Sequence, residues 1–192
     1  CILQQTLRVS RVATENDWLH RRAIIAVLKE LQGIDFSTSP AEVLSGAVAT
    51  ALKTLGAGDP MSGEREKLRI QLGPLVDYFQ NEIAAEASIE VAIRAAASAN
   101  LVDQCALKRF DLVTAIKAAF QAGFACGRQR MSRVLERIEK ARQIVYLLDN
   151  AGEADIDLLL VKQLVKRGKK VTLVVKSAGL LHDVTMNDLE AA

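Results

Sequence analysis

The sequence predicts an α/β protein in which a large N-terminal helical subdomain is followed by the start of a Rossmann-like parallel sheet. Two observations lead to this prediction. From residue 1 to about 143, apolar residues recur at intervals of three and four, which is typical of amphipathic helices. At Ile144 the period changes, and two short apolar runs flank one helical segment. We therefore expect a helical subdomain over 1–143 and one β-α-β unit with a following helix over 144–192.

Capping residues divide the first 143 residues into helices. Asp17 could cap one of them, and Ser39-Pro40-Ala41-Glu42 is a capping box with proline at the first helical position. Asp111 could cap a later helix in the same way. After a first segment near the N-terminus, the helices are expected to end near residues 33, 55, 83, 99, 120 and 142. A bend is expected near Gly73-Pro74 in the longest of them.

The C-terminal part is predicted to form one β-α-β unit. Ile144 to Leu148 and Val171 to Val175 are its strands, and Ala154 to Lys166 is the helix between them. Because the crossover of such a unit is right-handed, the strands lie parallel and their carboxyl ends open at one edge of the sheet. Two parallel strands do not make a complete sheet. We expect the missing partners to come from residues beyond 192 or from self-association.

Composition argues against several classes of protein. The net charge is +2 and the basic residues are dispersed, so neither nucleic acid nor a membrane is an expected partner. Neither a membrane-spanning run nor a secretory signal is recognised, which favours a cytoplasmic protein. The three cysteines, Cys1, Cys105 and Cys126, lack the spacing of a disulfide framework or zinc knuckle. The two histidines, His20 and His182, lie far apart, so zinc is a poor fit.

Polar side chains gather where the two predicted strands end. Asp149 and Asn150 follow the first strand, and Asp183 lies in the loop after the second. Their carboxylate and amide oxygens suit Mg²⁺, Mn²⁺ or a similar divalent ion. Lys176, at the tip of the second strand, could pair with a phosphate oxygen. The helix N-terminus after Gly152 could donate backbone N–H groups to the same anion.

Each of these residues also has a purely structural interpretation. Asp149 and Asn150 could cap the helix that follows them, and Asp183 could cap the next one. Lys176 could be a solvated strand end. Glu153 could be a first-turn acid that complements the helix dipole. Spacing alone leaves these alternatives open.

Several motifs together resemble a known family. Leu148-Asp-Asn-Ala-Gly-Glu153, followed by Asp157, is the most specific of them, and Val171 to Lys176 and Asp183-Val-Thr-Met186 extend it. These segments resemble the metal-dependent damage-control phosphatases, the domain-of-unknown-function 89 proteins, in their bacterial and archaeal branch. Supporting matches are Cys1-Ile-Leu-Gln-Gln5, Gly58-Asp-Pro60 with Lys67, and Ala99-Asn-Leu-Val-Asp103. The resemblance covers essentially the whole chain.

The resemblance implies hydrolysis of phosphate esters of small metabolites, sugar phosphates among them, with Mn²⁺, Mg²⁺, Co²⁺ or Ni²⁺. A metal-bound water would need no side-chain nucleophile. The implied metal ligands, which are also the implied catalytic residues, are Asp149, Asn150 and Asp183. The implied substrate-binding residues are Lys176, Asn100, Asp103 and Glu153.

The chain departs from the family pattern at a few positions. His182 stands where asparagine is usual, Asp155 where an apolar residue is usual, and Ser177-Ala178-Gly179 where Gly-Gly-Pro is usual. A Lys-Gly-Gly-Asn-Glu segment that the resemblance leads us to expect is not in the sequence, so we expect the Rossmann-like domain to be incomplete at its C-terminus. The alternatives to a phosphatase are a non-catalytic phosphate- or nucleotide-binding module and a helical interaction scaffold.

Overall fold

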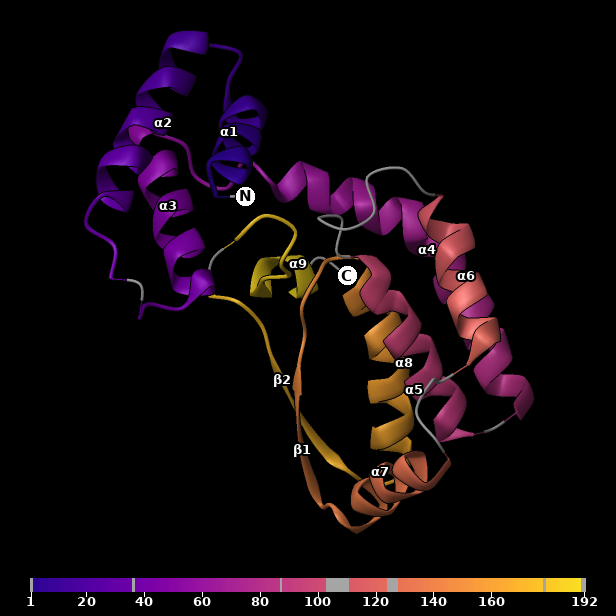
Figure 1. Ribbon diagram of the computed structural model, residues 1–192. Helices are drawn as coiled ribbons and strands as arrows, with labels where there is room; N and C mark the ends of the chain where they lie inside the picture. The colour runs from indigo at the N-terminus through magenta and orange to yellow at the C-terminus, as the bar shows by residue number, and fades with distance from the viewer. Residues whose placement is uncertain are drawn as a thin grey trace. The chain divides into compact units, whose positions relative to one another are not determined.

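The computed structural model describes residues 2–35, 37–86, 88–102, 111–123, 128–177 and 179–190. Helices dominate it, and two strands form a small parallel sheet (Figure 1). The elements are α1 Ile2–Ala13, α2 Asp17–Leu31, α3 Pro40–Leu55, α4 Ser62–Glu86, α5 Ile89–Ala99, the 3-10 helix η1 Asn100–Val102, α6 Leu112–Ala122, α7 Arg128–Lys140, β1 Gln143–Leu147, α8 Glu153–Lys166, β2 Lys170–Val174 and α9 Met186–Glu190. The predicted α/β class is confirmed.

The chain forms two compact units. The first contains residues 1–64 and 178–182, and the second contains residues 65–177 and 183–192. Helices α5 to α7 and the β-α-β unit therefore share one compact unit, although the change from helices to strands occurs near residue 143. The division of the chain at 143 remains a prediction of domain organisation. None of the helices in the described ranges combines the length and apolar character needed to cross a membrane.

Caps define the helices of the first unit. The predicted capping box at the start of α3 is present, with the Ser39 hydroxyl accepting from the Glu42 N–H at 3.3 Å and the Glu42 carboxylate accepting from the Ser39 N–H at 3.1 Å. Gly56 ends α3 with a φ of 64°, a conformation that glycine adopts without strain. The cap of α2 is Asn16 and not Asp17, because the Asn16 side chain accepts hydrogen bonds from first-turn N–H groups.

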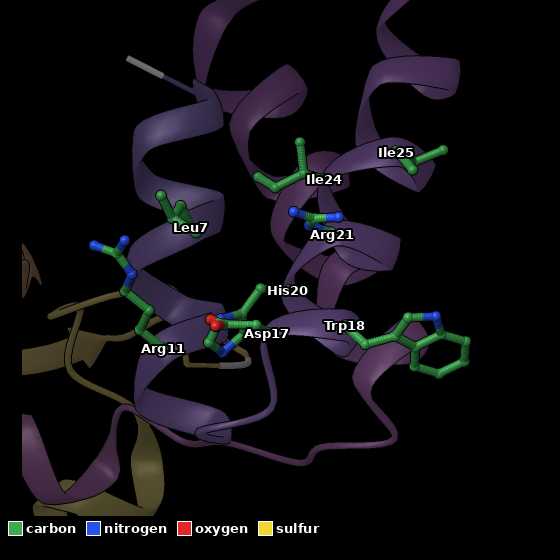
Figure 2. Close-up of a pocket in the computed structure, with 8 residues that line it drawn as sticks. All are labelled: Leu7, Arg11, Asp17, Trp18, His20, Arg21, Ile24 and Ile25. Carbon is green, nitrogen blue, oxygen red and sulfur yellow. The ribbon is translucent and has the colours of Figure 1, made fainter.

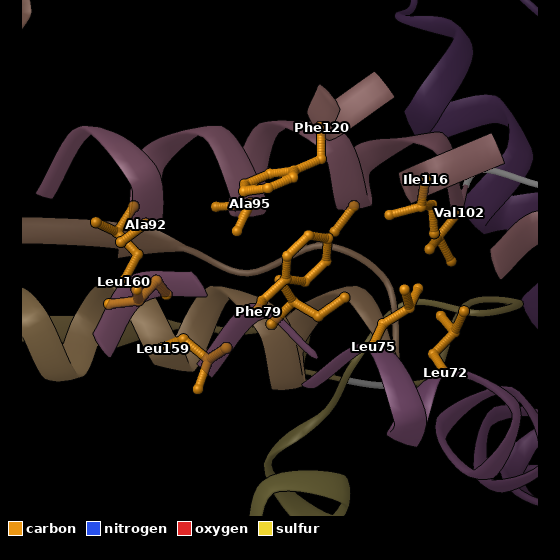
Figure 3. Close-up of a cluster of buried hydrophobic side chains, with 14 of the residues drawn as sticks. Leu72, Leu75, Phe79, Ala92, Ala95, Val102, Ile116, Phe120, Leu159 and Leu160 are labelled. Atoms are coloured by element: carbon orange, nitrogen blue, oxygen red, sulfur yellow. The ribbon is translucent and has the colours of Figure 1, made fainter. Parts of the chain in front are cut away.

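The core of the second unit lies where α4, α5, α6 and α8 meet (Figure 3). The rings of Phe79 on α4 and Phe120 on α6 have centroids 4.9 Å apart. Ala92 and Ala95 of α5 are fully or almost fully buried in the same cluster, which also contains Leu159 of α8. Small side chains on α5 leave room for a close approach of α8, which is why an alanine-rich helix occupies this position.

The β-α-β unit has the predicted topology. Strands β1 and β2 pair in parallel, with Ile144 opposite Val171 and Leu147 opposite Val174, and α8 connects them. Figure 1 shows the two strands side by side with α8 nearby. Both strands begin and end one residue earlier than predicted, but the Leu148 N–H still bonds the Val174 carbonyl at 2.9 Å. The carboxyl ends of both strands consequently lie at the same edge of the sheet.

Candidate active site

The segment after β2 returns to the tips of both strands. The N–H of Val184 donates to the carbonyl of Asp149 at 2.7 Å, and the N–H of Lys176 donates to the carbonyl of Val184 at 3.3 Å. Isolated bridges join Asn150 to Asp183 and Lys176 to Thr185. Backbone pairing therefore brings Asp183 to the strand tips, as the parallel topology predicted.

A lysine and two carboxylates form the polar centre of this edge. Lys176 Nζ lies 3.0 Å from Asp183 Oδ2 and 3.9 Å from Asp149 Oδ1. The hydrogen bond to Asp183 raises the pKa of Lys176 above its ordinary value. Because one ammonium group reaches both carboxylates, the two acids together attract a single cation. The Asp149 side chain is half exposed, so this position is open to solvent.

Two asparagines connect this centre to a buried glutamate. Asn150 Nδ2 lies 3.2 Å from Asp149 Oδ2 and 3.3 Å from Glu153 Oε2. Asn100, from η1, donates to Glu153 Oε1 at 2.9 Å. Burial raises the pKa of Glu153, and the two amide hydrogen bonds oppose that rise. The structure thus brings Asn100 and Glu153 to the other predicted site residues, whereas Asp103 lies outside the described residues.

The start of α8 requires a glycine. Gly152 is its N-cap, so neither Asp149 nor Asn150 holds the N-cap position. Gly152 has a φ of 83°, and an added Cβ would lie 2.8 Å from Leu72 Cδ1 and 3.3 Å from Leu68 Cγ. Positive φ and close contact with α4 therefore both favour glycine at this position.

A tyrosine and a second buried acid lie behind Glu153. The Tyr146 hydroxyl donates to Asp157 Oδ1 at 2.7 Å, and Asp157 is 4% exposed. Burial raises the pKa of Asp157 to about 7, and it also raises the pKa of Tyr146. Tyr146 is not among the site residues that the sequence predicts. Its signal in the sequence is weak, because a tyrosine within a strand is ordinarily a packing residue.

These side chains line an open pocket of about 650 Å³ in the second unit. Its polar lining consists of Asn100, Tyr146, Asp149, Glu153 and Asp157, and α5 contributes apolar residues. The pocket thus combines hydrogen-bonding groups with apolar side chains of α5, β1 and α8. Such a lining suits a small polar molecule with a carbon skeleton.

The donor set at the strand tips fits a hard divalent cation. Asp149, Asn150 and Asp183 offer two carboxylates and an amide, the oxygen donors that Mg²⁺ and Mn²⁺ prefer. That Lys176 reaches both carboxylates supports their use by one cation. Within the described residues, no group of three or more His, Cys, Asp or Glu side chains is placed to hold a metal ion, and the donor set at the strand tips has two carboxylates and one amide.

The first unit carries a second pocket, of about 710 Å³, lined by residues of α1 and α2 (Figure 2). His20 in its wall is not a free ligand, because Nε2 lies 2.7 Å from the Thr14 carbonyl and Nδ1 lies 3.3 Å from Asp17. Trp18 extends away from α1 in Figure 2, with Arg22 stacked 4.7 Å from its ring centroid. These two contacts of the imidazole ring give His20 a structural role.

Comparison with known proteins places the chain in a family. The model of the damage-control phosphatase ARMT1-like domain matches residues 1–192. Damage-control phosphatase PH1575 of Pyrococcus horikoshii is 22% identical over 196 residues, which cover 100% of this chain and 67% of that protein. A damage-control phosphatase of Archaeoglobus fulgidus is 41% identical over 59 residues, 30% of this chain and 20% of that protein.

A solved structure supports the fold. The crystal structure of the DUF89 family protein from Pyrococcus horikoshii aligns with a TM-score of 0.81 and 23% identity, covering 100% of this chain and 67% of that one. The chain thus spans about two thirds of the length of this relative. The family match over the whole sequence agrees with the resemblance seen in its motifs. The chain therefore belongs to the damage-control phosphatase ARMT1-like domain family.

Proposed function

We propose that this protein is a metal-dependent phosphatase that hydrolyses phosphate esters of small metabolites, sugar phosphates among them. Family membership supports phosphatase activity. The proposed metal dependence and phosphate-ester substrates rest on one observation. Asp149, Asn150 and Asp183 meet Lys176 at the carboxyl edge of the parallel sheet. This edge is where open α/β sheets bind their ligands.

Each group has a role in the proposal. Asp149, Asn150 and Asp183 would hold Mn²⁺, Mg²⁺, Co²⁺ or Ni²⁺, which when bound would lower the pKa of a water molecule and neutralise phosphoryl oxygens. Lys176 would bind a phosphate oxygen in the same neighbourhood, as a mobile point charge. Hydrolysis would break the ester P–O bond, with water supplying the new oxygen on phosphorus and the alcohol leaving with a proton.

The pocket lining would bind the organic part of the substrate. Asn100 holds Glu153 by a 2.9 Å hydrogen bond, and a glutamate oriented in this way can accept hydrogen bonds from hydroxyl groups. The apolar wall from α5 would contact the carbon skeleton of the metabolite. The protein would act in the cytoplasm, without nucleic-acid or membrane partners.

The test is release of inorganic phosphate by the full-length protein from sugar phosphates and a generic aryl phosphate, with each of the four cations and with a chelator. We expect turnover that depends on the cation and that Asp149→Ala abolishes without loss of the circular dichroism spectrum. Glu136→Gln, which removes one charge from the surface of α7, should retain activity. Cation binding without turnover would instead indicate a binding module, and no cation binding would refute the proposal.

A further inference from the structure

The second unit buries an arginine almost completely. Arg65 of α4 is 1% exposed, an unusual environment for this residue type. Its Nε donates to both carboxylate oxygens of Asp188, at 3.1 and 3.0 Å. Breaking a buried pair of this kind leaves an uncompensated charge. The pair is therefore a strong constraint between two segments 123 residues apart in sequence.

Asp188 has a second set of contacts, to Thr185. Asp188 Oδ2 accepts hydrogen bonds from the Thr185 N–H at 2.8 Å and from the Thr185 hydroxyl at 2.6 Å. Burial alone would raise the pKa of Asp188, but the hydrogen bonds from Thr185 and Arg65 outweigh it and hold the pKa below the ordinary value. The carboxylate is thus charged and fixed from both sides. It connects α4 to the turn that precedes α9.

Thr185 belongs to the segment that completes the candidate active site. Residues 183–185 pair with the tips of both strands, through the bridge of Thr185 to Lys176 and the 2.7 Å bond from Val184 to Asp149. The Asp183 carboxylate projects from this segment. Whatever fixes the backbone of Thr185 therefore also limits where the Asp183 carboxylate can lie.

We propose that Arg65 is a positioning residue for the active site, which acts through Asp188 to fix residues 183–185 and hence the Asp183 carboxylate relative to Asp149. The inference rests on the proposed function, because it concerns Asp183 as a ligand of the divalent cation. Residues behind metal ligands ordinarily change metal affinity by about 10- to 100-fold when they are removed. Arg65 would belong to this class.

A matched ion pair on the same helix provides the control. Arg69, one turn after Arg65, donates to Asp155 Oδ2 at 3.0 Å and so ties α4 to α8. This pair with Arg69 explains why position 155 holds an acid in this chain, where the family pattern usually has an apolar residue. Arg69 reaches the Asp188 carbonyl at 3.4 Å, so the variant to use is Asp155→Ala and not a change of Arg69.

The experiment measures Mn²⁺ affinity of the full-length protein by calorimetry, at a temperature where circular dichroism shows each variant fully folded. Asp188→Ala and Arg65→Met should weaken Mn²⁺ binding by about tenfold or more. Arg65→Lys, which keeps the charge, should recover part of that loss. Asp155→Ala should lower thermal stability but leave the Mn²⁺ affinity within about twofold of the unchanged protein, because its partner Arg69 meets Asp188 only at the backbone carbonyl, at 3.4 Å, and leaves the Asp188 carboxylate with Arg65 and Thr185.

The outcomes separate the inference from the proposed function. If the unchanged protein binds no Mn²⁺ or other cation, the proposed function fails. If it binds Mn²⁺ but Asp188→Ala and Asp155→Ala alter the affinity equally, or not at all, Arg65 and Asp188 only stabilise the fold and the inference is wrong. Should Arg65→Met not fold, Asp188→Ala and Arg65→Lys decide the question by the same measurement.

Discussion

Tyr146 and Asp157 share a 2.7 Å hydrogen bond that joins β1 to α8 behind the candidate active site. The bond pairs a phenol with a carboxyl group that is 4% exposed. Burial raises the pKa of Asp157 from 3.8 to about 7, although the hydrogen bond from Tyr146 opposes the rise. The folded protein therefore holds a proton here over a pH range in which the unfolded chain has released it.

This proton predicts how stability depends on pH. Between about pH 4 and pH 7 the folded state binds more protons than the unfolded state at Asp157, so the free energy of unfolding falls as the pH rises. The contribution of Asp157 to stability is complete below the pKa that Asp157 has in the unfolded chain. It is lost as the pH rises through the pKa that Asp157 has in the folded protein. One such group gives a slope of up to about 1.4 kcal/mol per pH unit. Denaturant titrations at pH 5, 6, 7 and 8 would measure it.

Asp157→Asn should flatten this slope, because the amide resembles the protonated acid at every pH. Glu136→Gln on the surface of α7 should leave the slope unchanged. Glu153, whose pKa burial also raises, contributes in the same direction and keeps some slope in Asp157→Asn. An identical slope in the unchanged protein and Asp157→Asn would show that Asp157 does not hold the proton.

Asn100→Ala should destabilise the second unit through Glu153. The change removes the 2.9 Å hydrogen bond to a carboxylate that is 4% exposed, and we expect a loss of about 1–3 kcal/mol in the free energy of unfolding at neutral pH. The loss should be smaller in a Glu153→Gln background, where a neutral amide replaces the carboxyl group that Asn100 bonds. Equal losses in both backgrounds, measured by denaturant unfolding, would contradict this explanation.

Local signals explain which parts of the fold could be predicted from sequence. The Ser39 capping box and the two apolar strands each depend on neighbouring residues, and both are found within a residue of their predicted positions. The cap of α2 is Asn16, one residue before the predicted Asp17, and both residue types are good caps. Propensity cannot choose between adjacent residues that can make the same hydrogen bond.

Long-range contacts explain what could not be predicted. Parallel topology was sufficient to bring Asp149 and Lys176 to one edge, since the two strand tips of one β-α-β unit must meet there. Asp183 lies well beyond the end of β2 and reaches this edge because residues 183–185 pair with the strand tips. By contrast, Arg65 and Asp188 lie 123 residues apart and Arg69 and Asp155 lie 86 apart. Nothing in the local pattern of a helix indicates that one of its arginines is buried against a distant acid.

Gly152→Ala should destabilise the protein, whereas Gly63→Ala should not. At Gly152 the φ of 83° and the contact with Leu72 at 2.8 Å both oppose a Cβ, so a loss of about 1–3 kcal/mol is expected. At Gly63, in the first turn of α4, a Cβ would meet no atom within 4 Å, and alanine should leave stability unchanged or raise it by up to roughly 1 kcal/mol. Thermal melts of the two variants test this, and a loss at Gly63 would contradict it.

Lys176→Met should change the binding of phosphate and of the divalent cation in opposite directions. Lys176 Nζ lies 3.0 Å from Asp183 Oδ2 and 3.9 Å from Asp149 Oδ1, so its charge competes with an added cation for the same carboxylates. Its removal should tighten Mn²⁺ binding severalfold, an effect that solvent moderates because the lysine is half exposed. Binding of inorganic phosphate in the presence of Mn²⁺ should weaken by about 1.5–3 kcal/mol.

The control is Lys140→Met, which breaks a surface pair with Glu136 and should change neither the Mn²⁺ affinity nor the phosphate affinity. Calorimetric titrations of Mn²⁺ and then phosphate would measure both affinities, and a parallel loss of the two would place Lys176 in support of the cation and not in contact with phosphate.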